Sequence, residues 1–139
     1  LGLTNVTLVG FSFGGFISLK TLEFNQKLIK HVFLIAPVYI VNGNPFIGLF
    51  KMFMPLKKFI KTSNVNYLKK VKKSAEQIET PITIFACEND IMFPGRKMIK
   101  RAKRIFSSIE DVVLIENAKH VPNSKNFKRI EDLIIAKNK

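Results

Sequence analysis

The sequence predicts an α/β fold, in which a parallel β-sheet is covered by helices on both faces. Two observations lead to this expectation. Short apolar runs typical of buried strands recur along the 139 residues and alternate with stretches whose apolar residues have helical spacing. Glycine, proline or charged residues separate these units, and neither an internal repeat nor a low-complexity linker divides the chain. We therefore expect a single domain over residues 1–139.

The first predicted unit is a strand followed almost directly by a helix. The apolar run Val6–Val9 has the length and composition of a short buried strand. The helix is expected from Gly14 to about Phe24, where apolar residues recur on one side. These residues are Phe16, Leu19 and Leu22.

Three further apolar runs predict the other strands of the sheet. Pro37 stops the first of these runs and Pro81 leads into the next, which fits the exclusion of proline from strand interiors. The three predicted strands are Val32–Ala36, Ile82–Ala86 and Val112–Ile115.

Two amphipathic stretches predict the remaining helices of the core. One begins after Pro94-Gly95, with proline at its start and basic residues on its outer side. Its apolar residues are Met98, Ala102 and Ile105. The other runs from Ser124 to the C-terminus and repeats the same spacing with Phe127, Ile130, Leu133 and Ile134.

Residues 38–80 break the alternation, and we expect them to form a small helical cap, or lid, inserted between two strands. This stretch carries clusters of Phe, Leu and Met, followed by a helical pattern with lysines on its outer side. Apolar walls bury the chain of a substrate, so the cap predicts a pocket. Packing of the cap onto the core explains the same residues equally well. The candidate pocket residues are Phe11, Phe46, Phe50 and Phe53.

The net charge of +13 raises the question of a polyanionic partner. Basic residues are scattered through the chain, and the abundant Lys, Ile, Phe and Asn are types that AT-rich codons encode. Nucleic-acid binding is therefore not expected. Basic residues on the outer side of the cap predict at most a weak association with an anionic membrane surface. The sequence predicts no oligomeric state.

Signals for targeting, metals and cofactors are absent from the sequence. No apolar stretch approaches the roughly 18 residues of a membrane span, and no signal peptide is visible, so we expect a cytoplasmic protein. The single cysteine, Cys87, excludes an internal disulfide. There is no cluster with metal-ligand spacing, no Gly-x-Gly-x-x-Gly and no phosphate loop, so neither a metal nor a cofactor is expected.

The stretch GFSFGG, at residues 10–15, follows the first predicted strand and opens the first helix. A serine at the tip of such a sharp turn has a strained backbone, and glycines two residues before and after it, Gly10 and Gly14, lack the Cβ atoms that would collide with the strand and the helix. Gly15 completes the elbow sequence. The turn would expose the Ser12 hydroxyl at the carboxyl end of the sheet, where the Phe13 N–H can face a developing oxyanion. A plain connecting turn is the alternative interpretation.

A serine nucleophile requires an imidazole as its base and a carboxylate that orients the imidazole. Of the two histidines, His31 opens a predicted strand and is assigned a structural role. His120 lies in a polar loop after the fourth strand, where catalytic groups collect. Asp90 follows the third strand and is chosen over Glu88 as the carboxylate. Cys87 is interpreted as a small buried residue rather than a rival nucleophile.

The chain as a whole resembles the α/β-hydrolase fold superfamily, specifically its small serine hydrolases of esterase and lipase type. GFSFGG resembles the nucleophile elbow of that family, ACENDIMFP its acid loop and ENAKHVP its histidine loop. Lys119 stands where many relatives have glycine. The resemblance implies Ser12 as nucleophile, Asp90 as orienting acid, His120 as general acid and base, and the Phe13 N–H as one oxyanion donor.

The resemblance also implies that the chain is the C-terminal part of a hydrolase, because family members have several strands ahead of the elbow and take a second oxyanion donor from one of those loops. We therefore expect the 139 residues alone to be poorly active. The predicted function is hydrolysis of a carboxylic ester, such as a lipid ester, through an acyl-enzyme. The alternative is a non-catalytic or truncated member of the fold that binds a membrane surface or a partner through its cap.

Overall fold

A parallel sheet of four strands forms the centre of the described part of the chain, as the sequence predicts. The computed structural model describes residues 2–38 and 77–138, and the strands of this part pair in the order β1-β2-β3-β4. Because sequence order and spatial order agree, each connection moves one strand along the sheet. The strands are β1 (Val6–Phe11), β2 (Ile29–Ile35), β3 (Ile82–Cys87) and β4 (Ile109–Ile115).

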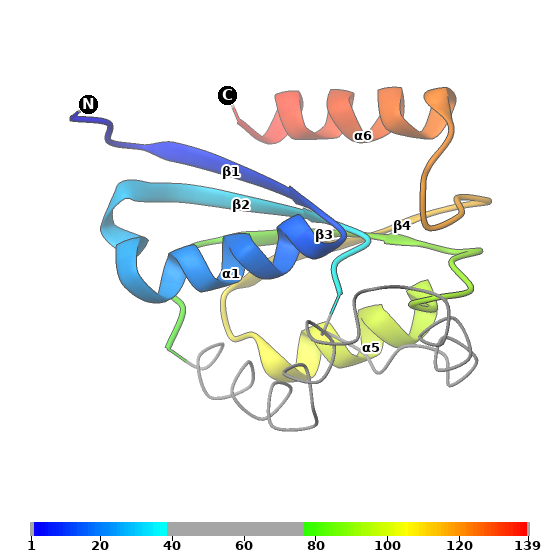
Figure 1. Ribbon diagram of the computed structural model, residues 1–139, viewed down its shortest axis with the longest axis horizontal. Coiled ribbons are helices and arrows are strands. Elements are labelled where there is room, and N and C mark those ends of the chain that lie inside the picture. Colours follow the sequence, from blue (N-terminus) through cyan, green and yellow to red (C-terminus); the bar gives the residue numbers. More distant parts are fainter. Residues whose placement is uncertain (1, 39–76, 139) are drawn as a thin grey trace, which may run out of the picture.

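Helices cover both faces of this sheet. Figure 1 shows α1 and α5 on one side of the strands and α6 on the other. A short 3₁₀ turn, η1, joins α1 to β2. The bounds of these elements are α1 (Phe13–Asn25), η1 (Gln26–Leu28), α5 (Gly95–Ile105) and α6 (Ser124–Lys137).

The two faces of the sheet form two separate cores, because successive side chains of a strand point to opposite sides. Val32 and Ile84 belong to the core under α1 and α5, together with the buried apolar side chains of those helices. Phe33 and Phe85 belong to the core under α6. All six residues of β3 are buried, which explains why its sequence is apolar except for Thr83.

All four strands begin or end beyond their predicted bounds, and β3 does so by one residue, at Cys87. β1 continues through Gly10 to Phe11, because these residues pair with β2. β2 begins at Ile29, so His31 is its third residue rather than its first. β4 begins at Ile109 and includes two acidic residues that a sequence pattern assigns to a loop. As an edge strand, β4 leaves these carboxylates partly exposed, beside Lys137 of α6.

The predicted apolar faces of the helices are confirmed for α1 and α5 and hold in part for α6. Phe16, Leu19 and Leu22 are buried in α1, as are Met98, Ala102 and Ile105 in α5. In α6 only Ile130 is buried, whereas Phe127 is 39% exposed. Residues 39–76, which include almost all of the predicted cap, lie outside the described residues. Among the helices described, none is long and apolar enough to cross a membrane.

Candidate active site

Ser12 lies at the junction between β1 and α1 in a backbone conformation that L residues rarely adopt. Its φ of 50° and ψ of −114° place it in the positive-φ region, which is strained for a residue with a Cβ. Three backbone hydrogen bonds hold this conformation. The Ser12 N–H donates to the carbonyl of Ile35 at 2.9 Å, and the Ser12 carbonyl accepts from Gly15 at 3.1 Å and Val38 at 3.2 Å.

The three glycines around Ser12 differ in how much space a Cβ atom would find at each position. A Cβ on Gly10 would lie 2.6 Å from the Gly14 carbonyl oxygen, and one on Gly15 would lie 2.8 Å from Pro37. A Cβ on Gly14 would meet nothing within 4 Å. The expectation that Gly14 relieves a clash is therefore wrong. Gly10 is required where α1 approaches β1, and Gly15 is required where α1 passes Pro37.

Hydrogen bonds connect Ser12, His120 and Asp90 in a continuous series. The Ser12 Oγ lies 2.9 Å from Nε2 of His120, and the other ring nitrogen, Nδ1, lies 2.7 Å from Oδ2 of Asp90. A carboxylate can only accept, so Nδ1 carries the hydrogen of the neutral ring and Nε2 accepts from the serine hydroxyl. This is the orientation in which an imidazole can take a proton from the serine.

Asp90 is held in place by the loop that follows β3. Its side chain is fully buried, and Oδ1 accepts the backbone N–H groups of Met92 at 2.8 Å and Phe93 at 2.9 Å. These two bonds occupy one carboxylate oxygen and leave Oδ2 directed at His120. The short side chain thus holds its own loop and accepts a hydrogen bond from the imidazole.

Glu88, the other candidate acid, faces different partners. Its carboxylate accepts the backbone N–H of Asn117 at 3.2 Å and the guanidinium of Arg96 at 2.7 Å. The Asn117 hydrogen bond and then the Arg96 contact hold the Glu88 pKa below its usual range. The structure therefore brings Asp90, and not Glu88, to the histidine.

Phe13 and two further phenylalanines lie around Ser12 and His120. Phe13 is the first residue of α1, so its backbone N–H is in the first turn, directly after Ser12. The ring centroids of Phe11 and Phe93 lie 5.7 Å and 5.6 Å from that of the imidazole. Sequence reasoning named Phe11 as a pocket residue and missed Phe93. Its position three residues after Asp90, in the same short loop, is the signal that could have indicated it.

His31 and Cys87 lie elsewhere in the sheet. Nε2 of His31 lies 3.0 Å from the Thr83 hydroxyl, Nδ1 lies 3.4 Å from a Glu110 carboxylate oxygen, and the ring stacks on Phe33. Burial lowers the His31 pKa, while Glu110 acts in the opposite direction. Burial, and secondarily Asp90, raises the pKa of the Cys87 thiol to about 11, so this thiol is a poor nucleophile.

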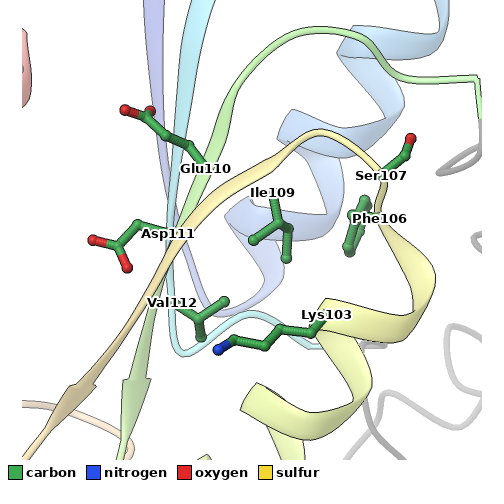
Figure 2. Close-up of a pocket in the computed structure, with 7 residues that line it drawn as sticks. All are labelled: Lys103, Phe106, Ser107, Ile109, Glu110, Asp111 and Val112. Carbon is green, nitrogen blue, oxygen red and sulfur yellow. The ribbon is translucent and has the colours of Figure 1, made fainter.

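A shallow pocket of about 470 Å³ lies at the opposite end of β4, away from Ser12. Figure 2 shows Phe106, Ile109 and Val112 around it, with Glu110 and Asp111 directed away from them. The predicted pocket residues Phe46, Phe50 and Phe53 lie outside the described residues. Within residues 2–38 and 77–138, no group of His, Cys, Asp or Glu side chains could hold a metal ion.

Comparison with solved structures identifies the fold. The carboxylesterase CesB (YbfK) from Bacillus subtilis superposes with a TM-score of 0.76 at 13% identity, over 98% of this chain and 60% of that one. An α/β hydrolase from the sediment metagenome of the Mar Chica lagoon, Morocco, gives 0.71 at 19% identity, covering 97% and 61%. A monoacylglycerol lipase from Paleococcus ferrophilus gives 0.67 at 15% identity, covering 98% and 70%.

These likenesses show that the chain has the α/β-hydrolase fold, as its sequence motifs predict. The chain spans about 60% of the length of the first two of these structures. No protein-family model matches the sequence. No curated protein matches it either.

Proposed function

We propose that the protein is a serine hydrolase that cleaves a carboxylic ester through an acyl-enzyme on Ser12. One observation carries the proposal, namely the series of hydrogen bonds from Ser12 through His120 to Asp90 at 2.9 Å and 2.7 Å. All three residues follow the carboxyl ends of strands in one parallel sheet, the edge at which α/β proteins bind their ligands.

The geometry supports a two-step reaction. In the first step the Ser12 Oγ attacks the ester carbonyl carbon while its proton moves to Nε2 of His120. The resulting tetrahedral intermediate collapses, and His120 gives that proton to the departing alkoxide. In the second step a water molecule gives a proton to His120 and attacks the acyl-enzyme, which releases the acid and returns the proton to Ser12. Asp90 stabilises the imidazolium in both steps.

The negative charge of the tetrahedral intermediate requires a donor near Ser12. We assign this role to the backbone N–H of Phe13, which opens α1, because the partial positive charge of a helix N-terminus favours an anion. One such donor is worth on the order of a hundredfold to a thousandfold in turnover.

The choice of an ester as substrate draws on the structural relatives. Two of them are named as a carboxylesterase and a monoacylglycerol lipase. Phe11 lies beside His120 and is 36% exposed, so its ring is available as an apolar contact for an acyl or alcohol group. A panel of soluble esters of increasing acyl length, with matched amides and thioesters, defines the substrate class.

A fluorophosphonate probe tests the nucleophile directly, because it reacts with activated serines. We expect the full-length gene product to label and its Ser12→Ala variant not to label. Ser107→Ala is a matched control, since Ser107 is exposed at the other end of the sheet. The 139-residue chain is labelled in parallel.

Folded full-length protein that does not label would overturn the proposal. That outcome would favour the non-catalytic alternative, in which the fold serves for binding. Labelling that survives Ser12→Ala would instead assign the activity to another serine.

Weak association with an anionic membrane surface is a further proposal about partners. The outer side of α5 supports it, because this side carries a series of exposed cations and only Arg96 has a described acidic partner, Glu88. The cations are Arg96, Lys97, Lys100, Lys103 and Arg104. Equal sedimentation of the protein with neutral and with anionic vesicles would contradict it.

A further inference from the structure

The loop between β3 and α5 contacts the histidine through a side chain that sequence reasoning did not single out. The ring of Phe93 has its centroid 5.6 Å from that of His120, with the two planes inclined by 49°. On the other element, Phe11 at the end of β1 lies 5.7 Å from the same imidazole at 36°. Phe11 is itself anchored by an edge contact with Phe127 of α6.

Two hydrogen bonds alone do not fix an imidazole. Bonds at Nε2 and Nδ1 define an axis through the ring, and the plane can still turn about this axis. Neighbouring side chains at van der Waals distance restrict that turning. The imidazole is only 15% exposed, so the surrounding groups also limit the access of water to its bond with Asp90. Exclusion of water strengthens such a bond, because the local dielectric constant falls.

Phe93 differs from Phe11 in that it contacts both partners of the histidine–aspartate pair. Its backbone N–H donates to Oδ1 of Asp90 at 2.9 Å, and its ring lies beside His120. The ring also packs against the core under α1 and α5, which fixes its own position. One residue therefore connects the loop that carries the acid to the loop that carries the base.

We propose that Phe93 is a positioning residue, whose ring holds the His120 imidazole in line between Ser12 and Asp90 and shields the His120–Asp90 hydrogen bond from water. The role rests on the proposed function, because it acts on the proton transfer from Ser12. The proposed role means that efficient hydrolysis requires an aromatic or similarly large side chain at position 93.

Substitutions at Phe93 isolate the ring, because each variant keeps the backbone N–H that binds Asp90. In the full-length protein we expect Phe93→Ala to lower kcat about tenfold to a hundredfold, since small misplacements of reacting groups have effects of this order. KM should stay within about twofold. Phe93→Tyr and Phe93→Leu retain most of the side-chain volume and should recover most of kcat. Phe24→Ala is the matched control, because Phe24 is 81% exposed on α1.

A spectroscopic measurement separates positioning from general loss of structure. The proton between Nδ1 of His120 and Asp90 should give a far-downfield resonance in the folded protein, because the bond is short and shielded. Under conditions where urea unfolding shows both variants to be folded, this resonance should broaden by exchange with water in Phe93→Ala and persist in Phe93→Tyr.

The two proposals fail in distinguishable ways. Lack of fluorophosphonate labelling in the wild-type protein contradicts the hydrolase function, whatever the variants do. An unchanged resonance and an unchanged kcat in folded Phe93→Ala would overturn the role of Phe93 and leave the hydrolase function standing. A fall in kcat that Phe93→Tyr and Phe93→Leu do not recover would also overturn it.

Discussion

Replacing Gly10 by alanine should destabilise the protein, whereas the same change at Gly14 should not. A Cβ at Gly10 would lie 2.6 Å from both the Gly14 carbonyl oxygen and the Ser18 hydroxyl, and 2.7 Å from the Cα of Gly15. Two of these three neighbours are backbone atoms of α1 and cannot rotate away. To reach an ordinary contact of 3.4 Å, the helix would have to move from the sheet by about 0.8 Å.

The size of the effect follows from this displacement. Overpacking of a tight contact costs about 1–3 kcal/mol. With a dependence of about 2 kcal/mol per molar urea, the midpoint of unfolding should fall by roughly 0.5–1.5 M. The shift would also move Ser12, which directly precedes the same helix, so labelling by a fluorophosphonate should slow. Gly14→Ala introduces a Cβ into open space within a helix and should raise stability by about 0.5–1 kcal/mol.

Urea unfolding of the two variants in the full-length protein, followed by circular dichroism, tests the steric argument. Labelling rates measured on the same samples report on Ser12. If Gly10→Ala unfolds at the wild-type midpoint, or if Gly14→Ala is the more damaging change, then the close approach of α1 to β1 does not explain the glycine at position 10.

Three more predictions concern titratable groups. Asp90→Asn should lower kcat by about a thousandfold to ten-thousandfold, because an amide stabilises the wrong imidazole tautomer. Glu88→Gln should retain activity within about twofold. Equal losses in the two variants would contradict the assignment of Asp90 as the orienting acid. Burial raises the Cys87 pKa to about 11, so only about 0.1% of the thiol is ionised at pH 8. Thiol reagents should therefore modify Cys87 only as urea unfolds the protein. Rapid modification of the native protein would contradict the burial of this thiol. Burial lowers the His31 pKa, so in acid the unfolded state binds a proton at His31 more readily than the folded state does. The contribution of neutral His31 to stability is complete above about pH 6.5 and is lost as the pH falls. His31→Gln should therefore flatten the fall of the urea midpoint between about pH 7 and pH 5, and an unchanged slope would exclude His31 as the cause of that fall.

The sheet was predictable because its central strands have continuous apolar sequences. Ile82–Cys87 is buried on both faces, and that environment selects only apolar or small residues. The edge strands were harder to delimit. Glu110 and Asp111 lie near the start of β4 although charged residues are typical of loops, since one side of an edge strand faces water. The sequence predicts an end of β1 at Val9 because glycine has low strand propensity, whereas Gly10 pairs with Leu34 of β2 and continues the strand.

The candidate site was predictable where chemistry demands particular residue types at strand ends. Ser12, Asp90 and His120 each follow a strand, and parallel strands bring their carboxyl ends together. Phe93 was missed because aromatic residues are frequent in this chain and none carries a spacing that marks contact with a histidine. Gly10 and Gly14 each stand two residues from Ser12, so the sequence does not distinguish their roles. Only the distances from each glycine to its neighbours in the fold show that Gly10 and not Gly14 is in a tight contact.

The distances in sequence between the three hydrogen-bonded residues have a consequence for how the chain acquires its site. Ser12 and His120 are 108 residues apart, and Asp90 is 30 residues from His120. Contacts between such distant residues close late, because long loops lose more entropy when their ends meet. Local helix formation in α1 or α6 cannot bring the serine to its base. A pulse of fluorophosphonate during refolding should therefore label molecules only after the four described strands have paired, so that reactivity at Ser12 reports when this part of the sheet has formed.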